Sequence, residues 1–211
     1  MNTTTLPQLR GTTREDIEKV IHFVDANVRR IRWDNSTLQQ KFLQRTALQI
    51  LNDGTTHYMG PCWDLTTVTN WLFRENGIPA HLIVERLIHK EQGITLHLAT
   101  QLPGRYLDHL GDNQTHSHPG TYQGWTNEKR VTTFVYTLPP AIATPEKNLI
   151  TTLEEGGYEQ KINDSEGTDK PSETLEGLFQ AKMRQALQAN TPTNFEQWLR
   201  KTPQILQLTY A

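Results

Sequence analysis

The chain has 211 residues, enough for one domain of ordinary size with a substantial core. Charged residues make up 21% of it and the formal net charge is -2, so it lacks the basic surface that nucleic acid or an anionic membrane attracts. The N-terminus lacks the order of a secretory signal, and no apolar run approaches the roughly 20 residues of a membrane span. We therefore expect a cytoplasmic protein that uses neither nucleic acid nor membrane as a partner.

The first part of the chain shows helical patterns. Apolar residues recur three and four apart from about residue 13 to 31, after overlapping capping boxes at residues 12–16. A second such pattern begins at Ser36 and ends at the stop signal of residues 52–54. A third follows Gly60-Pro61 and ends at the glycine cap of residues 76–77. The patterns predict three helices, with Cys62 in the first turn of the third.

The rest of the chain mixes strands and helices. Short β-branched runs predict strands at about 79–88, on both sides of a turn at Pro103-Gly104, and at 130–137. A polar stretch at 154–173 predicts a loop, and helices follow at about 173–189 and 194–201. We expect an α+β fold with helices packed on an antiparallel sheet. Residues 1–140 form the core, and the loop and helices of 141–211 pack on the same domain.

Cys62 is the only cysteine in the chain, so it has no internal disulfide partner. In the first turn of a helix, unpaired backbone N–H groups and the positive end of the helix dipole favour a thiolate, and the same N–H groups can hold an oxyanion. A lone cysteine on an apolar helix is also commonly a small buried core residue. A catalytic role needs a base and a group that orients this base.

The strands around Pro103-Gly104 offer both groups. A two-residue turn places Ala99 opposite Asp108. His97 and Ala99 share one face of their strand, so His97 and Asp108 become diagonal neighbours about 7–8 Å apart between backbones, within side-chain reach. A three-residue loop would instead put His97 on the opposite face from Asp108. The two-residue turn therefore predicts a histidine base oriented by an aspartate.

These features resemble the transglutaminase-like group of the papain-like cysteine-enzyme superfamily. A cysteine at a helix start is followed by Arg74, "NGIPAHLIVERL", His97 and the "YLD" of residues 106–108. The resemblance covers about residues 50–110 and implies a papain-like/transglutaminase-like core. It implies Cys62 as nucleophile, His97 as general base and acid, and Asp108 as the group that orients the imidazole.

The implied activity is acyl transfer through a thioester, by a peptidase or amidase if water resolves it, or by a transglutaminase-like transferase if an amine does. The substrate would be a peptide, a protein or a small acyl or amide compound. The chain reads "HLATQ" where the group usually carries "HAWxE", and its gap from histidine to aspartate is shorter. Both departures leave the substrate class open.

Other side chains near the cysteine are candidates for supporting roles. His57 and Tyr58, just upstream, are the nearest candidates for a second oxyanion donor, the alternative being an ordinary packed loop. Trp63, next to the thiol, is a candidate wall of the substrate cleft. Asp64, in the same turn, is either exposed and harmless or opposes formation of the thiolate.

Three alternatives remain. A transglutaminase-like domain can act as a catalytically inactive binding or scaffold protein. An arylamine N-acetyltransferase-like acyltransferase shares the Cys-His-Asp plan, although "HYMGPC" stands here in place of its usual "RGGxC". The histidines at 109, 116 and 118 raise the question of a zinc site, since His-x-His places two imidazoles on one side of an extended chain. Our expectation is an enzyme with neither metal nor cofactor.

Overall fold

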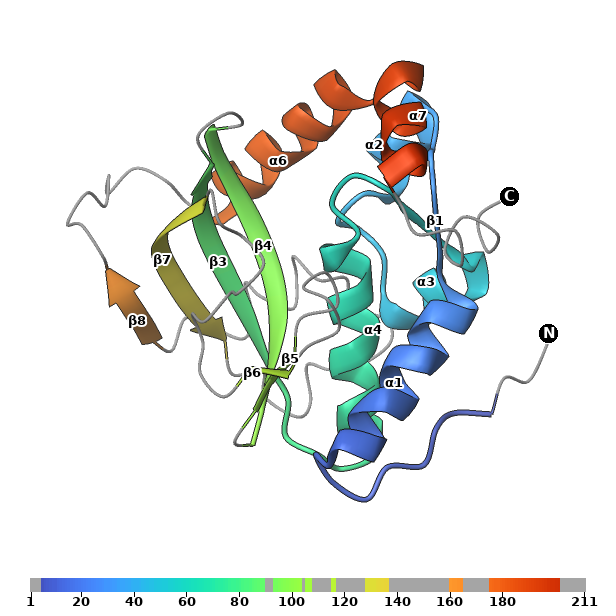
Figure 1. The fold of residues 1–211 in the computed structure, drawn as a ribbon, viewed down its shortest axis with the longest axis vertical. Helices are drawn as coiled ribbons and strands as arrows, with labels where there is room; N and C mark the ends of the chain where they lie inside the picture. Colours follow the sequence, from blue (N-terminus) through green and yellow to red (C-terminus); the bar gives the residue numbers. More distant parts are fainter. Residues whose placement is uncertain are drawn as a thin grey trace.

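A computed structural model describes residues 5–89, 93–103, 105–107, 115–116, 128–136, 160–164 and 175–201. It describes the backbone alone at residues 83–89, 93–97, 105–106, 115–116, 128–136, 160–164, 175–179, 181 and 201. This part of the chain is a mixed α+β structure, in which a layer of helices lies beside a sheet (Figure 1). The expected α+β class is confirmed. No helix in the described ranges is both long and apolar enough to cross a membrane.

The described helices begin where a cap or a proline starts them. They are α1 (Arg14–Asn27), α2 (Asn35–Lys41), α3 (Ala47–Asp53), α4 (Cys62–Glu75), α6 (Leu175–Ala189) and α7 (Pro192–Lys201). The side chains of Thr13, Asp34 and Thr46 accept hydrogen bonds from the first turns of α1, α2 and α3. For α7, Thr191 accepts from the Asn194 N–H and Pro192 follows it, two residues before the start expected from the sequence.

The second predicted helix is broken into α2 and α3. Leu43 between them adopts φ 65°, a left-handed conformation that stops a helix. Thr46 and Gln49 then form a reciprocal capping box that starts α3. Phe42 and Leu43 are both buried in the core, so tertiary packing compensates for the break. The prediction of one continuous helix was wrong because the apolar periodicity continues across this buried turn.

The main sheet is antiparallel in the order β6-β5-β4-β3-β7-β8. Its strands are β3 (His81–His89), β4 (Gly93–Leu102), β5 (Arg105–Leu107), β6 (Thr115–His116), β7 (Glu128–Tyr136) and β8 (Gln160–Asp164). β8 lies inside the predicted loop of 154–173, so that part of the loop prediction was wrong. A parallel pair, β1 (Arg29–Ile31) with β2 (Thr55–His57), was not predicted.

The register at the Pro103-Gly104 turn is the predicted two-residue one. Leu102 pairs with Arg105 and Thr100 pairs with Leu107. The same register continued by one residue sets Ala99 against Asp108, but Asp108 lies outside the described residues. The prediction is therefore confirmed for the part of the hairpin that the structure describes.

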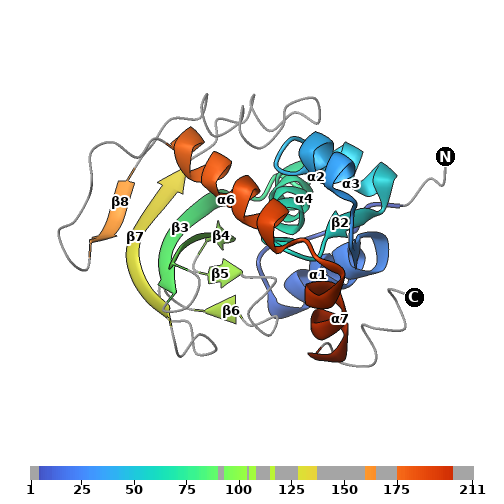
Figure 2. The ribbon, with the colours of Figure 1, turned by 90° about the horizontal axis from the view of Figure 1, so that it is seen from above.

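Helix α4 forms the centre of the structure. One of its sides packs on α1, where Val20 and Val24 share an apolar cluster with Val68 and Leu72. Its other side faces β4 of the sheet (Figure 1). Viewed from above, α6 crosses from the sheet to the helical layer, where α7 follows it (Figure 2). The C-terminal helices thus pack against the N-terminal part of the chain.

Candidate functional site

Cys62 is the first residue of α4 and is 3% exposed. Its core cluster includes Trp63 of the same helix, Leu98 of β4 and Ala186 of α6. The preceding residue, Pro61, is the N-cap and provides no side-chain hydrogen bond, in contrast to the caps of α1, α2 and α3. The sulfur therefore lies at a helix start whose N-cap residue contributes no side-chain hydrogen bond to the first-turn N–H groups.

Helix α4 runs alongside β4 in the same direction. The Thr66 hydroxyl donates to the carbonyl oxygen of Leu98 at 3.2 Å, and the Asn70 amide donates to the Thr100 hydroxyl at 2.7 Å. Four helical residues rise about 6 Å, close to the length of two strand residues. Cys62 lies four residues before Thr66, and Thr66 is level with Leu98. Counting about two strand residues back from Leu98 therefore brings Cys62 level with residues 96–97 of β4.

The two faces of β4 are distinguished by described side chains. Leu98 and Thr100 face α4, through the apolar cluster and the Asn70 hydrogen bond respectively. Because strand residues alternate between faces, Ala99 stands on the other face. In the predicted pair of His97 and Asp108, residue 97 lies on the same face of β4 as residue 99, which is the face away from α4. The His97 imidazole and Asp108 are outside the described part. The backbone pairing of β4 with β3 is regular at Glu85–His97 and Val84–Leu98, so a contact between His97 and Cys62 remains a prediction that requires this register to change next to Leu98.

Asp64 is neither exposed nor unpaired. Its carboxylate accepts from the Arg45 guanidinium at 2.5 Å and from the Thr56 hydroxyl at 2.6 Å, and both charged side chains are buried. Arg45 also pairs with Asp53 at 2.9 Å and lies over the Trp33 ring, 4.6 Å from its centroid. Burial raises the pKa of the Asp64 carboxyl, and the Arg45 charge opposes that rise. This network holds the first turn of α4 to α3 and β2.

His57 is buried and both of its ring nitrogens have partners. Nδ1 accepts from the Met59 N–H at 3.2 Å, which assigns the proton to Nε2, and Nε2 donates to the Asn190 side-chain oxygen at 3.2 Å. Burial lowers the pKa of His57, so the ring is neutral at pH 7. An oxyanion role for His57 would require the hydrogen bond to Asn190 to break.

Asn190 joins the C-terminal helices to the N-terminal part of the chain. Its amide nitrogen donates to the Trp33 carbonyl at 2.9 Å and to the Asn35 side-chain oxygen at 3.0 Å. Together with the His57 contact, these bonds fix the residue that follows α6 against β2 and the start of α2. Nothing in the sequence pattern signals this contact, because its partners are more than 130 residues away.

Tyr58 and Trp63 are both buried but have different surroundings. Tyr58 is 4% exposed, and its ring contacts Phe195 and Trp198 at centroid distances of 5.2 and 5.6 Å. Its hydroxyl has no hydrogen-bond partner among the described residues, and burial raises its pKa. Trp63 lies within the core cluster of Cys62. Of these two candidates, Tyr58 also lines the cavity described next.

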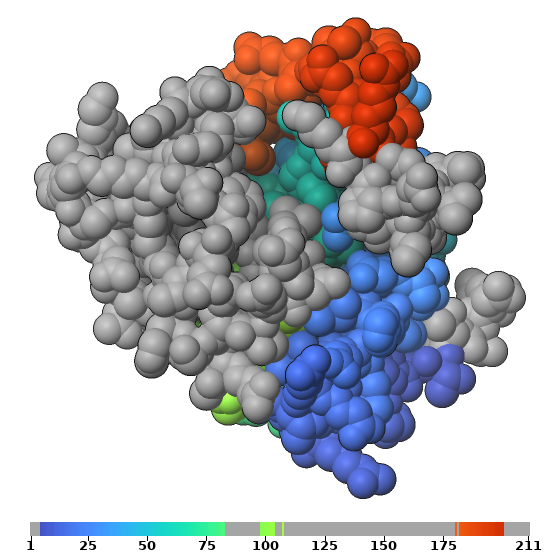
Figure 3. Space-filling view, in the orientation of Figure 1, coloured from blue at the N-terminus to red at the C-terminus, as the bar shows by residue number. Residues whose placement is uncertain are grey.

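A cavity of about 500 Å³ lies between the loop before α4 and the two C-terminal helices. In the space-filling view a hollow is visible below α6 and α7 (Figure 3). Its lining residues are Tyr58, Met59, Gly60, Lys182, Gln185, Ala186, Ala189, Asn194, Gln197 and Trp198. Sequence reasoning found Tyr58 but missed the α6 and α7 residues. The two aromatic residues of the predicted last helix were the available signal for a packed or binding face.

The metal alternative has no support within the described ranges, where no three His, Cys, Asp or Glu side chains are grouped as metal ligands. His109 and His118 lie outside these ranges, and only the backbone of His116 is described, in β6. Comparison of the chain with protein-family models, with curated proteins and with solved structures gave no match in any of the three.

Proposed function

We propose that this protein is a cysteine-dependent acyl-transfer enzyme with Cys62 as its nucleophile. The observation that carries the proposal is the uncapped start of α4 at Cys62. Three earlier helices have a side chain that accepts from their first-turn N–H groups, whereas α4 begins at a proline without one. An uncapped helix start stabilises negative charge on a thiolate or on a carbonyl oxygen under attack.

The proposed reaction has two halves. The Cys62 thiolate attacks a carbonyl carbon, and the leaving amine takes a proton from the His97 imidazolium as the thioester forms. Water or a second amine then attacks the thioester, gives its proton to the imidazole and releases the Cys62 thiolate, which restores the starting thiolate–imidazolium pair. Asp108 would orient the imidazole. Cys62 lies level with residues 96–97 of β4, which supports His97 by its place along the strand, and the reaction requires residue 97 to turn to the α4 face.

The thiol itself provides a direct test. Since Cys62 is the only cysteine, alkylation of the folded protein by iodoacetamide reports this one group. We expect rapid alkylation that becomes slow in His97→Ala and stays rapid in His22→Ala, a change at an exposed histidine of α1. Slow alkylation of the folded wild-type protein would contradict the catalytic proposal.

A second candidate function is a binding domain in which Cys62 serves only as a core residue. Its support is the burial of Cys62 among apolar side chains and the packing of Leu98, rather than a residue of the other β4 face, against it. Under this alternative, Cys62→Ala would retain full ligand binding and lose only stability.

Engineered disulfides separate the two candidates. A disulfide forms only when the two Cα atoms lie within about 7 Å and the Cβ vectors converge. Oxidised His97→Cys should cross-link to Cys62 if residue 97 faces the thiol, as catalysis requires. Leu98→Cys should cross-link to Cys62 instead if the side chains of β4 alternate regularly between its two faces at residues 97 and 98. Ala99→Cys, on the opposite face from Leu98, is the matched control that should remain reduced in both cases.

A further inference from the structure

His57 lies where the segment before α4 meets the end of α6. Its side chain is 1% exposed and lies between two aromatic rings, Trp33 at a centroid distance of 5.6 Å and Tyr58 at 4.7 Å. Its Nε2 donates to the Asn190 side-chain oxygen, which holds the ring from the side of α6. A ring held by two aromatic neighbours and by its Nε2 presents its other nitrogen, Nδ1, in one direction.

Nδ1 faces both polar groups of the Met59 backbone. The Met59 nitrogen lies 3.2 Å from Nδ1, and the Met59 carbonyl oxygen lies 3.3 Å from it. The neutral ring accepts from the Met59 N–H, whereas a protonated ring carries a hydrogen on Nδ1 and needs an acceptor. Because two donors cannot share a hydrogen bond, protonation exchanges the Met59 N–H for the Met59 carbonyl as the partner of Nδ1. The released N–H must turn away, which requires the Tyr58–Met59 peptide to rotate.

The surroundings of the ring set the pH at which this exchange occurs. Arg32, in the connection from β1 to α2, donates its Nε to the same Asn190 oxygen at 3.4 Å, so an imidazolium and a guanidinium would share one neutral acceptor. Tyr58 is the other titratable neighbour, and no carboxylate of the described residues bonds to the ring. Burial lowers the pKa of His57, its hydrogen bonds oppose this, and the Arg32 charge lowers the pKa further. The exchange is therefore expected below pH 6.5.

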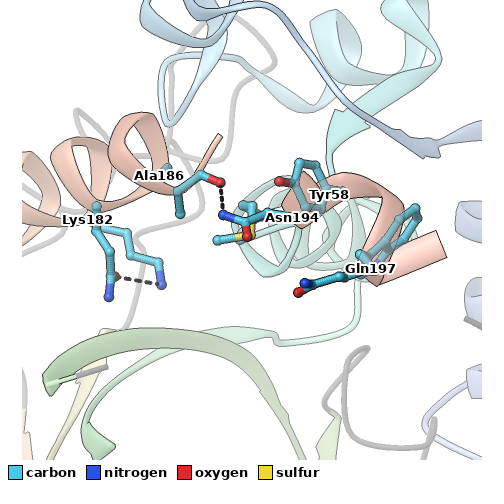
Figure 4. Close-up of a pocket in the computed structure, with 10 residues that line it drawn as sticks. Tyr58, Lys182, Ala186, Asn194 and Gln197 are labelled. Carbon is cyan, nitrogen blue, oxygen red and sulfur yellow. Dashed lines mark hydrogen bonds between the residues drawn. The ribbon is translucent and has the colours of Figure 1, made fainter. Parts of the chain in front are cut away.

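The Met59 backbone belongs to a short segment, residues 58–60, that links β2 to α4. These three residues line the cavity together with residues of α6 and α7. In the close-up, Ala186 of α6 lies on one side of this cavity and Tyr58 on the other (Figure 4). Gly60 has φ 79°, a left-handed conformation that glycine adopts without steric cost, and its carbonyl accepts from the Trp63 N–H at 3.5 Å. A rotation at Met59 therefore alters the cavity wall and reaches the first turn of α4.

We propose that His57 is a pH-sensitive switch that sets the conformation of residues 58–60 and with it the wall of the cavity. At neutral pH the uncharged ring holds the Met59 N–H. In acid the imidazolium holds the Met59 carbonyl, and the Tyr58–Met59 peptide is rotated. The switch is independent of the catalytic proposal, because it involves His57 and Met59 and no reaction of Cys62.

NMR titration of the full chain between about pH 5 and 8 tests the switch. The coupling between the amide and α protons of Met59 depends on its φ angle and not on a nearby charge. This coupling should change with the same midpoint as the His57 ring, below 6.5. The Met59 methyl group should shift with that midpoint, while Met183, outside the cavity lining, should keep its signal. An unchanged circular dichroism spectrum shows that the chain stays folded over this range.

Variants assign the effect to the ring and its neighbours. His57→Gln keeps a donor and an acceptor but does not titrate, so the Met59 coupling should become independent of pH. His22→Gln, at an exposed histidine of α1, should titrate as the wild type does. Arg32→Gln removes a cation that disfavours the imidazolium and should raise the midpoint by about half a pH unit. Arg30→Gln, two residues earlier and without a bond to Asn190, is its matched control and should leave the midpoint unchanged.

Three results would overturn the inference. One is protonation of His57 in the folded chain with a constant Met59 coupling. Another is a pH-dependent Met59 coupling that persists in His57→Gln. The third is a His57 ring that stays neutral until the chain unfolds.

Discussion

Replacing Asp64 with alanine should destabilise the protein strongly, because Asp64 neutralises a buried arginine. The substitution removes the 2.5 Å bond from Arg45 and the 2.6 Å bond from Thr56. Among the described carboxylates it leaves the Arg45 charge with Asp53, a 30% exposed side chain. Breaking a buried ion pair by removing one partner costs about 3–5 kcal/mol. For a chain of this size each kcal/mol lowers Tm by about 2–4 °C, so we expect a decrease of about 6–20 °C.

Urea unfolding followed by tryptophan fluorescence measures this loss. Asp53→Ala is the matched control, since it breaks two ion pairs, with Lys41 and Arg45, at a more exposed carboxylate and should cost no more than about 1 kcal/mol. The double variant Asp64→Leu with Arg45→Met removes both buried charges and should recover most of the loss. If Asp64→Ala costs less than about 1 kcal/mol, or no more than Asp53→Ala, the ion pair does not hold the start of α4.

Three further predictions concern the residues around the site. Gly60 has φ 79°, and an added Cβ would lie 3.2 Å from the Phe42 ring, so Gly60→Ala should cost about 1–2 kcal/mol in urea unfolding, whereas Gly11→Ala, with open space around it, should be neutral. The pKa of His57 is lower in the folded state than in the unfolded chain, so as pH falls below about 6.5 the unfolded chain protonates His57 before the folded protein does. Stability should therefore decline below that pH by at most about 1.4 kcal/mol per pH unit, and His57→Gln should show a shallower decline in parallel unfolding titrations. Asn190→Ala should cost about 2–3 kcal/mol and expose the α6–α7 connection to limited proteolysis, and unchanged cleavage would refute its role as the link to Trp33 and Asn35.

Local sequence signals predicted the elements that local forces determine. The capping threonine and apolar spacing placed α1, and the Pro103-Gly104 dipeptide placed the β4–β5 turn with its register. The glycine-proline pair located the start of α4 at the cysteine. In each case residues within one or two turns contain the whole signal, so no knowledge of the tertiary structure was needed.

Features that depend on distant contacts were not predictable. The break at Leu43 is compensated by burial in a core that includes residues of β4 and α6. Asp64 had two opposite interpretations from its position in the helix, and only the folded neighbour Arg45 decides between them. The cavity joins residues 58–60 to a pair of helices more than 120 positions later. Sequence periodicity contains no information on such pairings without homologous sequences.

The β4–β5 register was predicted correctly, but it does not determine whether His97 faces Cys62. The turn correctly predicted which residues of β4 and β5 stand opposite one another, but register within a sheet does not determine which face meets α4. That choice is made by Thr66 and Asn70, polar residues of α4 that bond to Leu98 and Thr100. The β3–β4 ladder runs through the pairs Glu85–His97 and Val84–Leu98 without a register shift. This regular strand puts residues 96 and 98 on the α4 face and residue 97 on the other, so catalysis by Cys62 and His97 requires the strand to shift by one residue between 97 and 98. A β-bulge is the known device that makes such a shift, and bulges are frequent beside active sites.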